Sequence, residues 1–214
     1  ADPHDAVLVL NPDIRLAPDC ATELLAVLRR RGAGITVPRI VRGNGDFSPC
    51  LRREPTIMRA FADALVGANR VGKITWLGEV VTDQRRYDDE AVVDWAEGSI
   101  LLIDRGCWDA CGPWDESFFL YSEETEYALR VRDNGYAMVY APRAGARHLE
   151  GDSAVSPPLW TLLTLNRVRL YRRRHSMPAA AVYWAMILMR EGIRAATGNA
   201  CSRKAARALL SPAR

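Results

Sequence analysis

The chain has 214 residues, of which 49% are hydrophobic and 26% charged, a composition typical of a globular protein with a sizeable core. No apolar run is long enough to span a bilayer as a helix. Five cysteines form no CxxC pair and only three histidines are present. This usage argues against a zinc site or a disulfide framework, and it favours a reducing, cytoplasmic setting.

Charge is distributed unevenly along the chain. From Trp160 onward there are 11 Arg and Lys residues and a single acid, Glu191, whereas the preceding part holds 18 basic and 25 acidic residues. An acidic body with a basic tail predicts that the tail contacts an anionic partner, such as the inner face of the cell membrane. Nucleic acid is not the expected partner, because no nucleic-acid-binding motif accompanies this charge. Packing of the tail on the domain, with a solvated arginine face, explains the pattern equally well.

Predicted strands and helices alternate along the chain. Residues 6–10 are a continuous apolar run typical of a buried parallel strand, and residues 67–90 show no clear period and are expected to form a surface loop. The other predicted elements are a helix over 19–31, a strand over 35–37 ended by Pro38, a turn over 43–46, a helix over 56–66, strands over 92–95 and 99–103, a short helix within 104–112, a helix beginning near Ser122, a strand over 136–140 halted at Pro142, and helices over 159–174 and 179–196. This order predicts an α/β sandwich with parallel strand pairs. Pro157-Pro158 predicts a boundary between a domain over 1–157 and a helical tail over 158–214.

The first candidate site residue is Asp13, in the turn Asn11-Pro12-Asp13 after the first strand. A carboxylate at the end of a buried strand is suited to holding a hard divalent cation, which in turn neutralises a diphosphate. The alternative is a simple turn in which Asp13 caps the next segment.

A cluster of carboxylates forms the second candidate site. Ser122 as N-cap and the helix dipole account in part for Glu123, and the spacing of Glu126 and Arg130 favours an ion pair. The apolar lead-in over 118–121 is not explained in this way. It predicts that the carboxylate cluster reaches a semi-buried position, where burial raises a glutamate pKa toward the range of a general base.

Two further candidates are a histidine and a segment that contains an aromatic residue. His148 follows a predicted strand by one short loop, and neutral imidazole is a common metal ligand, although a lone histidine is more often a hydrogen-bonded structural residue. Trp95, Glu97 and Gly98 place a ring suited to stacking on a sugar beside an acid and a glycine that permits close backbone approach. A buried tryptophan in a strand is the competing interpretation.

Several short motifs occur in a characteristic order. They are Leu10-Asn-Pro-Asp13, Trp95-Ala-Glu-Gly-Ser-Ile-Leu-Leu-Ile103, Gly112-Pro-Trp-Asp-Glu-Ser-Phe-Phe-Leu-Tyr121, Ser122-Glu-Glu-Thr-Glu126, Leu129-Arg130, Gly135-Tyr136, and His148 with Gly151 and Ser153. In this order the motifs resemble the family-2 glycosyltransferases, especially bacterial rhamnosyltransferase-like members that build surface polysaccharides. The resemblance covers roughly residues 6–175.

The resemblance implies a GT-A fold, a Rossmann-related mixed sheet sandwiched by helices, and an inverting transfer from a nucleotide-sugar to a saccharide or lipid-linked acceptor. Asp13 matches the metal-binding acid of the family's DxD-type motif, and Asn11 stands where its first acid would be. His148 resembles a metal or diphosphate ligand found in some members, and the implied metal is Mg²⁺ or Mn²⁺. Glu124, with Glu123 beside it, matches the catalytic base, which is usually Asp in the family. A list of residues in implied contact with donor or acceptor contains Asn11, Trp95, Glu97, Gly98 and Arg130.

The chain departs from the family at its N-terminus. Relatives carry a nucleotide-binding segment before the Asn-Pro-Asp motif, and the resemblance therefore implies that the fold is N-terminally incomplete. Two hypotheses follow. In the first, the chain is a glycosyltransferase or the C-terminal part of one, cytoplasmic and peripheral on the membrane. In the second, it is a non-catalytic remnant that docks on a membrane or a partner protein through its basic tail.

Overall fold

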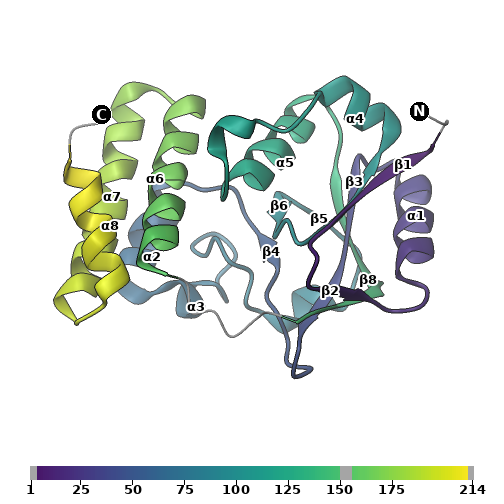
Figure 1. Ribbon diagram of the computed structural model, residues 1–214, viewed down its shortest axis with the longest axis horizontal. Helices are drawn as coiled ribbons and strands as arrows, with labels where there is room; N and C mark the ends of the chain where they lie inside the picture. The colour runs from purple at the N-terminus through teal and green to yellow at the C-terminus, as the bar shows by residue number, and fades with distance from the viewer. Residues whose placement is uncertain (1–3, 150–155, 212–214) are drawn as a thin grey trace. The chain divides into compact units, whose positions relative to one another are not determined.

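The computed structural model describes residues 4–149 and 156–211 (Figure 1). Its contacts divide the chain into two compact units, each assembled from separate segments. The sheet unit comprises Ala1–Glu54, Val80–Asp115 and Glu124–Asp152, and the helical unit comprises Pro55–Glu79, Glu116–Glu123 and Ser153–Arg214. The division at residues 157 and 158 expected from the sequence stays a prediction. Each unit is described by itself below.

The sheet unit is built on a mixed sheet, as the sequence predicted. Its strands are β1 (Ala6–Leu10), β2 (Ile14–Leu16), β3 (Ile35–Arg42), β5 (Ala91–Val93), β7 (Ile100–Asp104) and β8 (Met138–His148). The order is β1-β7-β3-β8-β2, with β5 also paired to β8, and only the β3–β8 pair is parallel. A second, two-stranded sheet pairs β4 (Leu51–Arg52) with β6 (Trp95–Ala96).

The first strand is present, but its predicted environment is wrong. β1 pairs antiparallel with β7 at one end of the strand order, so it is neither parallel nor central. Leu8 and Leu10 remain 37% and 43% exposed. A continuous apolar run is typical of a strand buried on both faces, and here it occupies a partly exposed position.

Two strands continue through prolines that were expected to end them. β3 passes through Pro38 and β8 passes through Pro142, and their parallel register shifts between Pro38 and Arg39, which pair with Ala141 and Gly145. Proline is tolerated in a strand at such an irregularity, because the ladder there does not require its missing N–H. The irregular pairing therefore lets β8 run on to His148.

Three helices pack on the main sheet. They are α1 (Cys20–Arg31), α4 (Arg105–Cys111) and α5 (Glu123–Asp133), and all three were predicted. Helix α1 ends at Gly32, whose φ of 57° is the left-handed conformation that glycine adopts without strain. Leu24 of α1 and Tyr127 of α5 are fully buried in one apolar cluster with the sheet residues.

Besides a short 3₁₀ helix over Glu116–Phe118, the helical unit contains five α-helices among its described residues. They are α2 (Ile57–Val66), α3 (Ala68–Val71), α6 (Pro157–Arg174), α7 (Met177–Ala196) and α8 (Ala200–Leu210). The sequence predicted α2, α6 and α7 but not α8, whose N-terminus is capped by Asn199. A core around Tyr171, Tyr183 and Ile187 joins α6 and α7 to α2 and α8. No helix in the described part of the chain has the length and apolarity needed to cross a membrane.

Candidate active site

The turn after β1 determines where Asp13 lies. The backbone N–H of Asn11 donates to the carbonyl of Ser99 at 2.9 Å, and the N–H of Ile14 donates to the carbonyl of Asn11 at 3.2 Å. The first bond ties the end of β1 to the segment before β7, and the second closes a tight turn between β1 and β2. Pro12 is compatible with the turn because it needs no donor there. Asp13 is consequently half-buried immediately before β2.

His148 lies directly against this turn. It is the last residue of β8 and pairs in register with Ile14 of β2. Nε2 of His148 lies 3.1 Å from Oδ2 of Asp13, and the backbone N–H of Leu149 donates to the carbonyl of Asp13 at 2.9 Å. The imidazole is only 12% exposed. The strand pairing thus brings together an acid and a histidine that are far apart in the sequence.

Glu97 lies at the other edge of the same imidazole. Its Oε1 is 3.4 Å from Nδ1 of His148, which is buried and makes no hydrogen bond within the described residues. The N–H of Glu97 donates to the carbonyl of Cys50 at 2.9 Å, and this bond holds the glutamate's backbone in place. The two ring nitrogens of His148 therefore each face a carboxylate, one from Asp13 and one from Glu97.

Gly98 connects this group to Glu124. A Cβ added at Gly98 would lie 3.0 Å from Cβ and 3.3 Å from Cγ of Glu124, so the absence of a side chain lets the two segments approach closely. One carboxylate oxygen of Glu124 is buried. Contacts thus run from Asp13 through His148, Glu97 and Gly98 to Glu124, and they bring several acids to one region of the sheet unit.

A loop of unusual backbone geometry precedes Glu123 and Glu124. Phe119, Tyr121 and Ser122 have positive φ values of 61°, 68° and 72°. Each such conformation costs a non-glycine residue about 1–2 kcal/mol, and strain of this kind clusters at functional sites. Ser122 therefore lacks the extended geometry of the predicted N-cap, and α5 begins with Glu123, which has one buried carboxylate oxygen.

The sequence did not reveal what holds this loop. Asn166 of α6 is 5% exposed, and its Nδ2 donates to the carbonyls of Phe118, Leu120 and Tyr121 at 2.9, 2.9 and 3.1 Å. All four residues belong to the helical unit. The only signal in the sequence was an asparagine within the Leu-Thr-Leu-Asn run of a predicted helix, a position where a buried polar group requires partners.

Two other predicted site residues have their polar groups bonded within the protein. The buried ring of Trp95 donates through Nε1 to the carbonyl of Arg53 at 3.0 Å, as in the competing interpretation of a buried strand residue. Arg130 forms the predicted ion pair with Glu126 at 2.9 Å. Its guanidinium also donates to the carbonyls of Cys111 and Pro113. Contact of Trp95 or Arg130 with a sugar stays a prediction.

The donor set at His148 is compatible with a divalent cation. Carboxylate oxygen and imidazole nitrogen together suit Mn²⁺, whereas Mg²⁺ prefers oxygen ligands alone. Within the described residues, however, no three His, Cys, Asp or Glu side chains are arranged to hold one ion. The reason is that Asp13 and Glu97 lie beside different nitrogens of the ring. Gly151 and Ser153, which were part of the family motif, lie outside the described residues.

Comparison with known proteins shows the family of the chain. The chain is 30% identical over 155 residues to N-acetylglucosaminyl-diphospho-decaprenol L-rhamnosyltransferase of Mycobacterium tuberculosis, an alignment that covers 72% of the chain and 50% of that protein. It is 24% identical over 148 residues to rhamnosyltransferase WbbL of Escherichia coli, with 67% and 52% covered. The chain belongs to the family-2 glycosyltransferases.

The fold agrees with this family. The structure of GalNAc-T7 with UDP, GalNAc and Mn²⁺ superposes with a TM-score of 0.50 at 15% identity, over 77% of the chain and 31% of that protein. The likeness shows a GT-A fold. No protein-family model matches the chain. This family-2 member spans about half the length of the rhamnosyltransferases it matches.

Proposed function

We propose that the sheet unit forms part of a glycosyltransferase active site that uses a nucleotide-sugar donor and transfers the sugar with inversion. The contact of Asp13 with His148, linked through Glu97 and Gly98 to Glu124, is the observation that carries the proposal. We propose a saccharide or lipid-linked acceptor, because the M. tuberculosis relative is named for a diphospho-decaprenol substrate.

In this proposal Glu124 is the general base. It removes the proton from an acceptor hydroxyl as that oxygen bonds to the anomeric carbon, and the bond from the anomeric carbon to the diphosphate breaks on the opposite face. The diphosphate leaves with the bonding electrons. Gly98 supports the role of Glu124 because it allows the glutamate to lie close against the backbone. Glu123, one position earlier on α5, is the second carboxylate in the proposed catalytic group.

Asp13 and His148 would hold a divalent cation, Mn²⁺ or Mg²⁺, which neutralises charge on a departing diphosphate. Electrostatics support this assignment. Asp13, Glu97 and Glu124 give the region several carboxylates, which repel a nucleoside diphosphate unless positive charge is supplied. Asp13 and the ring of His148 would supply one oxygen and one nitrogen ligand to such an ion.

Titration calorimetry tests the cation site directly. The chain is titrated with Mn²⁺ in the presence of individual nucleoside diphosphates. The Asp13→Asn variant is expected to bind the ion about tenfold to hundredfold more weakly, because a charged ligand is lost. Asp109→Asn is the matched control, since Asp109 is an exposed acid of α4 that pairs with Arg105. Equal Mn²⁺ affinity of the native chain and Asp13→Asn would refute the assignment.

A further inference from the structure

Several arginines of the basic tail form ion pairs inside the helical unit. Arg167 of α6 pairs with Glu79. Arg190 of α7 is 5% exposed and pairs with Asp63 of α2 at 2.7 Å, and Arg194 lies 3.4 Å from the same carboxylate. These guanidinium groups hold the helices together, and they are not available to an external anionic surface. The tail therefore has fewer basic side chains available to bind an anionic surface than its sequence contains.

A different part of the helical unit exposes large apolar side chains. Met58, Phe61 and Leu65 follow the i, i+3, i+7 spacing that places them on one side of α2. The opposite side of α2 packs through Ala60 against α7. The exposed apolar side chains of this helix and of the segment that follows it are Met58 at 52%, Phe61 at 41%, Leu65 at 57%, Val66 at 49%, Ile74 at 43% and Trp76 at 65%.

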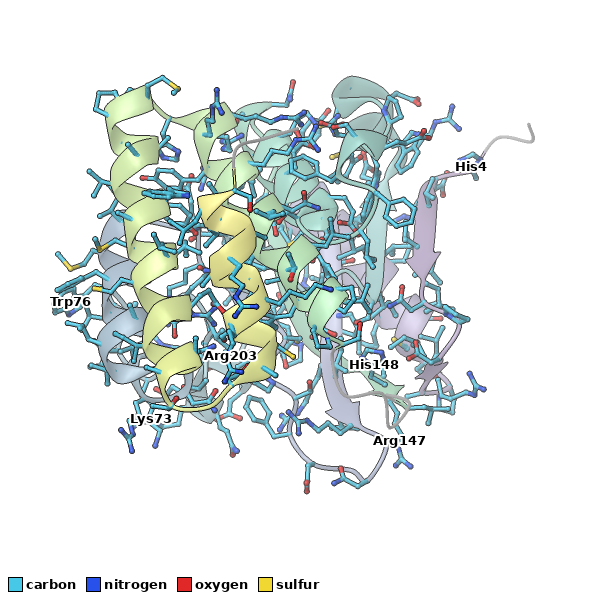
Figure 2. The ribbon with its side chains drawn as sticks, turned by 60° about the vertical axis from the view of Figure 1, so that its left-hand side comes forward. His4, Lys73, Trp76, Arg147, His148 and Arg203 are labelled. Atoms are coloured by element: carbon cyan, nitrogen blue, oxygen red, sulfur yellow. The ribbon has the colours of Figure 1, made fainter. Side chains whose placement is uncertain are left out.

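The exposed charged side chains of this segment have one sign. Arg70 and Lys73 are exposed, whereas the two acids of Pro55–Glu79 are both bound inward, Asp63 to Arg190 and Glu79 to Arg167. Lys73 and Trp76 project outward from the helical unit (Figure 2). The segment thus presents apolar and cationic groups together, and none of its acidic side chains is exposed.

We propose that the six apolar residues above, together with Arg70 and Lys73, form one face of the helical unit, and that this face docks on a lipid surface that carries anionic head groups. An amphipathic helix with phenylalanine and leucine on one side is the usual interfacial anchor, and tryptophan prefers the boundary between head groups and acyl chains. Lysine and arginine beside it attract anionic lipids. The face lies outside the carboxylate site, and the inference does not rest on the proposed transfer reaction.

The observations favour a lipid surface over a protein partner. Cationic and apolar side chains together match the boundary between anionic head groups and acyl chains. Trp76 and Leu65 are among the most exposed large apolar side chains of the described residues, and they lie in one segment whose exposed charged side chains are all basic. Among the tryptophans of the described residues, Trp76 alone is exposed. Its fluorescence can therefore report insertion.

Co-sedimentation with vesicles tests the face against the basic tail. The full chain is mixed with vesicles of phosphatidylcholine alone or of phosphatidylcholine with phosphatidylglycerol. The double variant Arg70→Gln/Lys73→Gln is expected to partition about 30-fold more weakly onto the anionic vesicles, since each cation near such a surface contributes about 1 kcal/mol. The control is Arg203→Gln/Lys204→Gln on α8, two exposed cations of the tail, for which binding should be unchanged.

The apolar half of the face has its own test. Trp76→Ser should weaken partitioning at least about tenfold and should do so at high salt as well, because apolar burial is not screened. Leu210→Ser, at a side chain 63% exposed on α8, is the matched control and should have no effect. Vesicles with brominated acyl chains should quench the fluorescence of the native chain and quench Trp76→Ser less.

Three outcomes would overturn the proposal. Failure of the native chain to bind anionic vesicles would remove the lipid partner. An equal loss in the Arg203→Gln/Lys204→Gln control would assign binding to the tail. Self-association of the native chain that Trp76→Ser abolishes, with vesicle binding unchanged by that substitution, would show that the face binds a second copy of the chain.

Discussion

Replacing Asn166 with aspartate is expected to destabilise the loop that precedes the proposed catalytic acids. The substitution keeps the size of the side chain but removes its donor. In the native chain Nδ2 of Asn166 lies 2.9–3.1 Å from the carbonyl oxygens of Phe118, Leu120 and Tyr121. In the variant an oxygen takes the place of this nitrogen and faces the same three carbonyls. The carbonyl of Phe118 then loses its partner in a buried position, and the carbonyls of Leu120 and Tyr121 lose theirs in partly buried positions.

The magnitude follows from the bonds that are lost. Two amide hydrogens serve three acceptors, so about two full hydrogen bonds disappear, each contributing about 1 kcal/mol, and an unsatisfied buried carbonyl adds about 1–3 kcal/mol. The expected loss is therefore about 3 kcal/mol or more. The loop has little capacity to absorb it, since Phe119, Tyr121 and Ser122 already adopt left-handed conformations. For a chain of this size the loss corresponds to a fall in Tm of about 10 °C.

Chemical denaturation measures the free energy of unfolding, and hydrogen exchange measures local opening of residues 118–122. The Asn166→Asp variant should show a lower denaturation midpoint and faster exchange in this loop. Asn134→Asp is the control, because Asn134 is exposed and donates one bond to the carbonyl of Arg130 at 2.9 Å. An Asn166→Asp chain as stable as the native one, with unchanged exchange, would show that the three bonds do not hold the loop.

Two further predictions concern close packing and buried thiols. Gly98→Ala should leave the fold intact but lower the rate of sugar transfer about tenfold to hundredfold, because its Cβ displaces Glu124 by a few tenths of an ångström; Gly192→Ala, with no atom within 4 Å of the added Cβ, should transfer at the native rate. Burial raises the pKa of the Cys50 thiol to about 12, so in mildly alkaline solution a disulfide reagent should modify only Cys201 of the five cysteines until the chain is unfolded. Rapid labelling of a second thiol in the native chain would contradict the described burial.

Local patterns predicted most helices and strands, but not where the strands end or how they pair. Helix α1 shows apolar spacing and a closing glycine, and both signals act within a few residues. Pro38 and Pro142 were interpreted as strand ends because a lone proline removes one ladder bond. That reasoning fails here, since both residues lie at one shared irregularity in the β3–β8 register, which depends on the partner strand.

Tertiary contacts also determine the folded structure of a segment whose sequence shows no periodicity. Residues 67–90 were expected to be a surface loop, yet Tyr87 is fully buried and its hydroxyl donates to the carbonyl of Val81 while accepting from the N–H of Leu51, both at 2.9 Å. The partners of one aromatic residue organise this stretch. Such partners lie elsewhere in the chain and leave no local pattern.

The sequence named the residues of the candidate site, but it did not predict which of them contact one another. The motif order singled out Asp13, His148 and Glu124, and pairing of β2 with β8 explains why the first two meet. The position of Glu97 at the second nitrogen of His148 was not foreseen, because it depends on where the β6–β7 turn lies relative to β8. Asn166 was missed for the same reason.

The pairing of β8 has a consequence for synthesis of the chain on the ribosome. β8 bonds to β2, β3 and β5, all of which are translated earlier. Its parallel partner β3 ends at Arg42, whereas β8 begins only at Met138. Non-local pairings of this kind close late, because a long loop must be ordered first. The strands made earlier therefore lack their partner β8 until residue 148 emerges from the ribosome. Chaperone binding should be strongest during that interval.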